Sequence, residues 1–61
     1  MSQLNEQELQ NLRHLIGSHE TTSQKMQQYA QQSQDPQVKQ TFQKQAQEAQ
    51  NTKQRLLSYL S

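Results

Sequence analysis

Apolar residues, with a few small or polar ones, recur through the first half of the chain at spacings that alternate between three and four. This alternation is the heptad pattern of a helix that packs along one seam. The seam comprises Leu9, Leu12, Ile16, His19, Ser23, Met26, Ala30 and Ser33. A second row beside it, at Leu15, Thr22 and Tyr29, repeats every seven residues and widens the stripe. A stripe of this width predicts a bundle helix rather than a two-stranded coiled coil.

The start of this helix is marked by residues that can satisfy its free backbone N–H groups. Asn5 suits the N-cap, and Glu8 lies three residues later, as in a capping box. Leu4 can contact Leu9 as a hydrophobic staple. These residues predict a helix that begins at Asn5.

The second half of the chain repeats the alternating pattern after a break at Asp35-Pro36. Its predicted seam comprises Val38, Phe42, Gln45, Ala49, Thr52, Leu56 and Tyr59. Proline lacks the N–H that a helix interior needs, and its ring keeps the preceding residue out of the helical region. Asp35 and Pro36 also suit the cap and first position of a new helix. We therefore expect a hinge at Asp35 and Pro36.

The pattern predicts an all-α fold, a single antiparallel hairpin of two helices over residues 1–61. The first helix is expected at about 5–34, the turn at about 34–36 and the second helix at about 36–60. Folding about the hinge sets Ser23 near Ala49 and Ile16 near Leu56. The resulting core is uneven. Its turn end contains Tyr29, Val38 and Phe42, its middle is polar, and most large apolar residues lie at the open end, away from the turn.

Two helices cannot cover every side of that open end. We expect a second hairpin to cover it, which gives a homodimeric four-helix bundle whose hairpins are each half of a ferritin-like fold. A partner of similar shape is the alternative. The predicted oligomer interface comprises Leu9, Leu12, Leu15, Ile16, Leu56, Leu57, Tyr59 and Leu60.

Composition supports association and narrows the classes of function. Only 28% of the 61 residues are hydrophobic and there is no cysteine, so neither a large core nor disulfides can stabilise a lone hairpin. Glutamine accounts for 16 residues, which we interpret as an uncharged helix exterior. The net charge of +1 comes from dispersed groups, which argues against nucleic-acid binding. No apolar run is long enough for a signal peptide or a membrane span, and a cytoplasmic location is expected.

The residues offer no catalytic constellation, and we expect no enzyme activity and no cofactor. The polar middle contains one set worth weighing as a metal site, formed by His19, Glu20 and Glu48. Ferritin-type bundles bind two metals with glutamates and Glu-x-x-His pairs, but here Asn51 stands where the histidine after Glu48 would be. The set is therefore incomplete, and we expect a buried or half-buried His19 that is hydrogen-bonded to Thr52, Ser23 or water, and no metal.

A resemblance to a known family lies in the run Tyr29-Ala30-Gln31-Gln32-Ser33-Gln34-Asp35-Pro36, followed by Val38 and by Leu56-Leu57-Ser58-Tyr59-Leu60. Over roughly residues 18–60 the chain resembles small CotF-like spore-coat proteins of endospore-forming Firmicutes, which are helical and ferritin-like. Some relatives have histidines on the second helix, where this chain has Ala49, Thr52 and Lys53. The resemblance implies a role in the spore coat, with other coat proteins as possible partners, and implies no catalytic residue.

The sequence thus predicts a non-enzymatic structural or assembly protein that associates with itself through its apolar helix faces. Two alternatives belong to other classes. The first is a reduced ferritin-like metal-binding bundle that uses His19, Glu20 and Glu48. The second is an adaptor whose exposed seam accepts a foreign helix.

Overall fold

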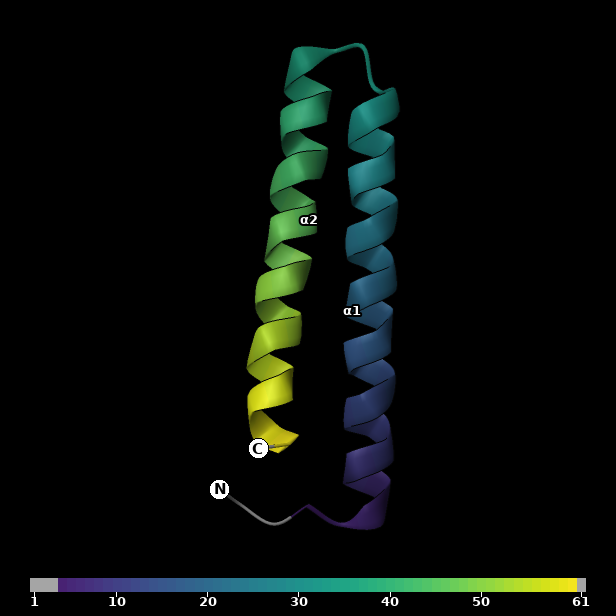
Figure 1. The fold of residues 1–61 in the computed structure, drawn as a ribbon, viewed down its shortest axis with the longest axis vertical. Helices are drawn as coiled ribbons and strands as arrows, with labels where there is room; N and C mark the ends of the chain where they lie inside the picture. Colours follow the sequence, from purple (N-terminus) through teal and green to yellow (C-terminus); the bar gives the residue numbers. More distant parts are fainter. Residues whose placement is uncertain (1–3, 61) are drawn as a thin grey trace.

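A computed structural model of the chain describes residues 4–60 and confirms an all-α antiparallel hairpin. Helix α1 spans Glu6–Gln32 and helix α2 spans Pro36–Leu57, followed by a single 3-10 turn, η1, at Ser58–Leu60. The two helices lie side by side along their whole length, and both ends of the described chain lie opposite the turn (Figure 1). Residues 1–3 and 61 of the predicted domain lie outside the described residues.

The start of α1 confirms the predicted capping box. The Asn5 side chain accepts a hydrogen bond from the Glu8 backbone N–H at 2.8 Å, and the Glu8 side chain accepts from the Asn5 backbone N–H at 3.0 Å. Two of the N–H groups that have no partner inside the helix are therefore satisfied, and the two glutamates of the first turn suit the positive end of the helix dipole. Local chemistry alone fixes this end of α1.

The hinge ends α1 and starts α2, as its residues predict. Ser33 and Asp35 are both in extended conformations, so α1 stops at Gln32, two residues before the predicted limit. Asp35 is the N-cap of α2: its Oδ1 accepts from the N–H groups of Gln37 at 2.8 Å and Val38 at 3.3 Å. Pro36 takes the first helical position, where a missing N–H costs nothing. The connection is thus short enough to force the two helices into contact.

The helices meet through small residues. Among residues 4–60, the buried side chains are Leu12, Ser23, Ala30, Ala46 and Ala49. Ser23 is completely covered, and its hydroxyl donates a hydrogen bond to the Ala46 carbonyl across the interface at 3.1 Å. Small side chains let the two helix backbones approach closely. Because the Ser23 hydroxyl has a hydrogen-bond partner, its burial leaves no donor unpaired.

The seam of α2 is rotated from its predicted position. Gln45, Val38 and Tyr59 were expected on it but are exposed, while Ala46 is only 3% exposed. The physical reason is that facing Ala46 towards α1 buries a methyl group and leaves the Gln45 amide in water. Facing Gln45 inwards would instead bury an amide that needs hydrogen-bond partners. The prediction for α1 is confirmed, because all eight of its seam residues are buried or half-buried.

Candidate interaction surface

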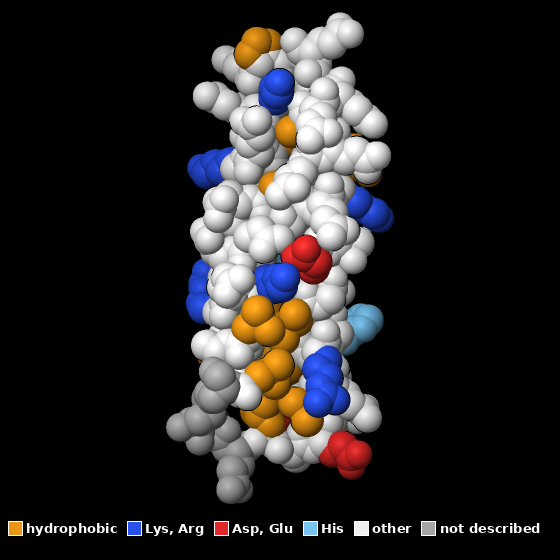
Figure 2. All heavy atoms as spheres, viewed as in Figure 1, with side chains coloured by type: hydrophobic (Ala, Val, Ile, Leu, Met, Phe, Trp, Pro, Cys, Tyr) orange, Lys and Arg blue, Asp and Glu red, His pale blue; other side chains and the backbone are white. Residues whose placement is uncertain are grey.

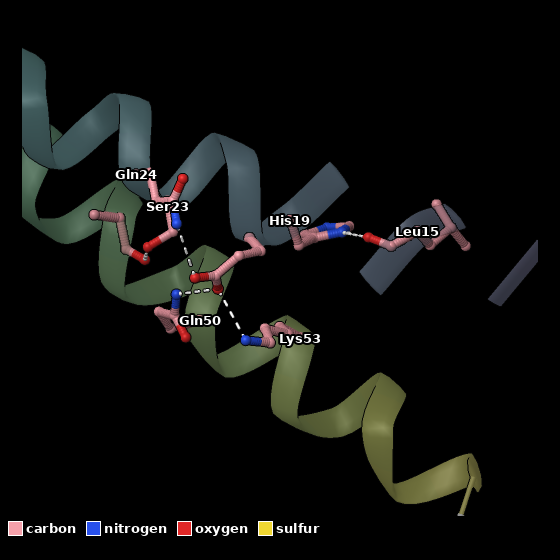
Figure 3. A network of polar contacts seen from close by, with 8 residues as sticks. Leu15, His19, Ser23, Gln24, Gln50 and Lys53 are labelled. Atoms are coloured by element: carbon pink, nitrogen blue, oxygen red, sulfur yellow. Dashed lines mark hydrogen bonds and ion pairs between the residues drawn. The ribbon is translucent and has the colours of Figure 1, made fainter. Parts of the chain in front are cut away.

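A polar network joins the two helices near the middle of the hairpin (Figure 3). Glu20 on α1 lies at its centre, where one carboxylate oxygen, Oε2, accepts from Gln50 Nε2 at 2.8 Å and from Lys53 Nζ at 2.9 Å. The other oxygen, Oε1, accepts from Gln24 Nε2 at 3.3 Å. The hydrogen bond from Lys53, followed by that from Gln50, lowers the pKa of the Glu20 carboxyl from its ordinary value. The network clamps α1 to α2 at one register.

The three residues considered for a metal site are not brought together. His19 is half-buried, as expected, but its Nδ1 lies 2.8 Å from the Leu15 carbonyl oxygen of its own helix and not against Thr52 or Ser23. A carbonyl oxygen can only accept, so Nδ1 donates in this contact. Figure 3 shows His19 directed towards Leu15 and away from Gln50 and Lys53.

Glu48 is exposed on another side of α2. Since Gln50 faces Glu20, a residue two positions earlier points about 200° away around the helix. Glu20 itself is neutralised by Lys53, the kind of partner that a metal ion would have to displace. Within residues 4–60, no group of three or more His, Cys, Asp or Glu side chains has a geometry suited to a metal ion.

Two surface hollows have walls from a single helix. One lies beside Gly17 on α1 and the other beside Thr41 on α2. A ligand there would contact one helix and water, whereas small-molecule sites enclose most of their ligand. Neither hollow therefore has the enclosure that is typical of a small-molecule site.

The predicted interface residues lie at the open end, where they are unevenly covered. Leu12 is buried, and Leu9, Ile16, Leu56 and Leu57 are half-buried. The most exposed members are Leu15 at 45%, Tyr59 at 51% and Leu60 at 43%. Figure 2 shows hydrophobic side chains gathered over the open end between the two helices, while the middle of the same face is mostly polar. The large apolar side chains are thus the ones that two helices leave uncovered.

Part of this apolar region forms a groove of about 280 Å³ between α1 and α2. The groove at the open end is lined by Leu4, Glu8, Asn11, Leu12, Leu15, Leu56 and Tyr59. Apolar grooves between helices are surfaces on which the apolar face of another helix can be buried.

A second apolar groove at the turn end was missed as an interaction surface. It is lined by Tyr29, Gln32, Ser33, Val38 and Phe42. Tyr29 and Phe42 pack as a tilted aromatic pair with ring centroids 5.6 Å apart, but Tyr29 is still 44% exposed and Val38 43% exposed. From the sequence, Tyr29, Val38 and Phe42 were predicted to form the turn end of the core. The seven-residue row from Leu15 to Tyr29 was the available signal, since it places Tyr29 on the same side of α1 as an interface residue.

Comparison of the chain with protein-family models, with curated proteins and with solved structures gives no match. In the part of the chain that the structure describes, no helix is long and apolar enough to cross a membrane.

Proposed function

We propose that this chain is a non-enzymatic structural protein that associates with itself through its exposed apolar surface to form a four-helix bundle. The observation that carries the proposal is the exposure of Leu15, Tyr59 and Leu60 at the open end, beside a groove lined mainly by leucines. Burial of apolar area is the main driving force for association, at about 25 cal/mol per Å². A second hairpin supplies the cover that a lone hairpin lacks.

The identity of the buried residues supports the same proposal. Four of the five buried side chains are Ser or Ala, which bury little apolar area each. A chain of this size with so small a core is only marginally stable alone, and oligomerisation is a common remedy when disulfides and metals are absent. Association would therefore contribute to folding as well as to assembly.

The setting that we propose for this assembly is the spore coat. Its support is the resemblance of residues 29–36 and 56–60 to CotF-like coat proteins, and a long polar hairpin with apolar ends is suited to stacking with copies or with other coat components. A fluorescent fusion of the full chain, expressed in its native host, is expected to surround the developing spore. Uniform cytoplasmic fluorescence throughout sporulation would contradict this setting without bearing on self-association.

Sedimentation over a range of concentrations tests the self-association. We expect a helical species that shifts from monomer to dimer as concentration rises, with thermal stability rising in parallel. The double variant Leu15→Gln with Tyr59→Gln removes apolar surface at two exposed positions and should abolish the shift. His14→Gln is the control, because His14 is exposed on the outer side of α1.

A well-folded monomer at micromolar concentration would overturn the proposal. In that case the open-end groove would still need an occupant, and the adaptor function, in which the groove accepts a foreign helix, would take its place.

A further inference from the structure

The exposed apolar side chains of the hairpin are concentrated on one face. Five large hydrophobic residues in the described chain are exposed, and four of them line the two grooves: Leu15 and Tyr59 at the open end, Tyr29 and Val38 at the turn end. Leu60 is the fifth. We call the surface that carries both grooves the groove face.

Helical periodicity shows that the two grooves share this face. Leu15 and Tyr29 are two heptads apart on α1, and Phe42 and Leu56 are two heptads apart on α2. A straight α-helix drifts by about 20° per heptad, so each pair lies on nearly the same side of its helix. At 1.5 Å per residue the two grooves are about 21 Å apart along the hairpin.

Between the grooves the face is mainly polar, with two charged residues beside it: Lys25 lies four residues before Tyr29 on α1, and Glu48 lies between Gln45 and Thr52 at spacings of three and four on α2. Along each helix, the positions between the two grooves on this side are Thr22 on α1 and Gln45 and Thr52 on α2. Glu8, at the extreme open end, is the one charged residue among those described as lining either groove. Covering this face therefore desolvates short hydroxyls and amides, which can hydrogen-bond across an interface.

The opposite side of the seam has charged residues at its middle, although Figure 2 shows hydrophobic side chains at its open end. Glu20, Gln50 and Lys53 occupy it, and we call it the bridge face. The side chains of Lys53 and Glu20 are 24% and 36% exposed, so water still solvates the ion pair. Covering the ion pair would remove that water at a cost in free energy. The attraction between Glu20 and Lys53 already exists in the single hairpin, so no new attraction offsets this cost.

The size of a stable interface decides how much of the groove face is needed. The open-end groove extends from Leu4 to Leu15, about 16 Å of helix length. The whole hairpin is 46 Å long and 16 Å wide. Its full face is on the order of 700 Å², close to the roughly 800 Å² per partner of a standard interface, whereas the open end alone supplies about a third of that.

We infer that the second copy of the chain covers the groove face over its whole length, so that Tyr29 and Val38 at the turn end are interface residues together with Leu15 and Tyr59. This inference rests on the self-association proposed above. A second copy is the fitting occupant because it has two apolar patches separated by the same 14 residues on each helix, and because the full face supplies the area that a standard interface needs. A two-fold interface joins identical surfaces, so each patch meets a patch and each centre meets a centre.

The centre of the face offers the sharpest test, because adjacent threonines provide a matched pair. Thr22 lies on the groove face, while Thr21 is turned about 100° away towards the outer side of α1; both are exposed. Thr22→Lys places a charge in the covered centre and should weaken the dimer by about tenfold or more, as sedimentation equilibrium would measure. Thr21→Lys adds the same charge and should leave the dissociation constant within about threefold of the wild type.

The turn end is tested by a second pair. Val38→Glu puts a carboxylate near the N-terminus of α2, where it suits the helix dipole, so helix content should be retained while the dimer weakens by about tenfold. Gln43→Glu is the control, since Gln43 is exposed on the same helix, lines neither groove and points about 140° away from Val38 around α2. A dimer that tolerates Thr22→Lys and Val38→Glu but is lost in the Leu15→Gln, Tyr59→Gln variant would overturn this inference and leave the proposed self-association intact. A wild type that stays monomeric at every concentration would overturn both.

Discussion

The middle of the hairpin and its open end differ in what they bury. In the middle, Ser23 and Ala46 lie against each other almost without exposed surface. At the open end, Leu15 and Tyr59 are about half exposed although they are far more hydrophobic. Most of the side chains that are fully buried between the helices are therefore small, and most of the large ones stay partly exposed at the edges of the interface.

The two regions therefore have different roles in this hairpin: one sets the register of the helices, and the other contains most of the large apolar side chains. The middle sets the register of the helices, through the Ser23 hydroxyl and the Glu20 network, while contributing little hydrophobic free energy. The open end has most of the large apolar side chains, but Leu15, Tyr59 and Leu60 are each about half exposed to water. The register of the two helices is thus well defined, but burial of apolar area stabilises the hairpin only weakly. Association with a second copy then contributes a large share of the folding free energy.

The largest effect on the free energy of unfolding is expected at a large side chain that is buried. Leu12 is 8% exposed, so Leu12→Ala should lower the free energy of unfolding by about 2–5 kcal/mol, the usual range for a buried leucine. Thermal unfolding followed by circular dichroism measures the loss. Leu60→Ala, at a position that is 43% exposed, should cost less than about 1 kcal/mol. Equal losses in the two variants would show that the open end is covered more evenly than the structure indicates.

A somewhat smaller effect should come from enlarging the middle. Ala46→Leu inserts three carbons at a buried position beside Ser23 of α1 and should cost about 1–3 kcal/mol through overpacking. Gln45→Leu is the matched control at the next position, which is exposed and should tolerate leucine without loss. If Gln45→Leu is stabilising and Ala46→Leu is neutral, the seam of α2 follows the sequence prediction and not the structure.

A gain in stability is expected at Gly17, an exposed residue that belongs neither to the buried middle nor to the apolar open end. Gly17 is exposed on α1, and a methyl group added there would meet nothing within 4 Å. Gly17→Ala should raise the free energy of unfolding by about 1 kcal/mol, because glycine is a poor helix former. Denaturant unfolding tests this, and a loss of stability would mean that α1 needs a bend or a close contact at Gly17.

The smallest effect concerns the ion pair on the bridge face. The folded-state pKa of Glu20 lies below its ordinary value of 4.5, so the stability it contributes is present above that value and lost as pH falls through the lowered pKa. Glu20→Gln should be slightly less stable than wild type at neutral pH, with the two converging in acid. Both side chains are partly exposed, and water screens the attraction, so the difference at neutral pH should be modest. Parallel melting curves at all pH values would contradict the role given to Glu20.

The parts of the fold that follow from local chemistry could be predicted from the sequence. Asn5 and Glu8 cap α1, and Asp35 and Pro36 open α2, through contacts between residues at most four apart. The rotation of α2 could not be predicted in this way. Ala46 and Gln45 both fit a repeat of three and four, and the choice depends on Ser23 of the other helix. The link from Glu20 to Lys53, 33 residues away, was missed for the same reason.

The candidate surface was predicted in part. The open-end leucines were named from the sequence, but Tyr29 and Val38 were assigned to a core that the turn does not enclose. How much of a side chain remains exposed depends on the distance and rotation between two helices, and no local pattern encodes either quantity.

By itself, the sequence determined that this chain forms two amphipathic helices, where they begin, and that a short hinge folds them against each other. These outcomes depend on backbone capping, on proline and on helical periodicity, all of which act between near neighbours. Only the tertiary structure decided which side of α2 faces α1, which residues become buried and that the exposed hydrophobic side chains line one face at both ends. Those outcomes depend on contacts between residues more than 12 apart in the chain, where close packing favours small side chains and leaves large ones at the edge.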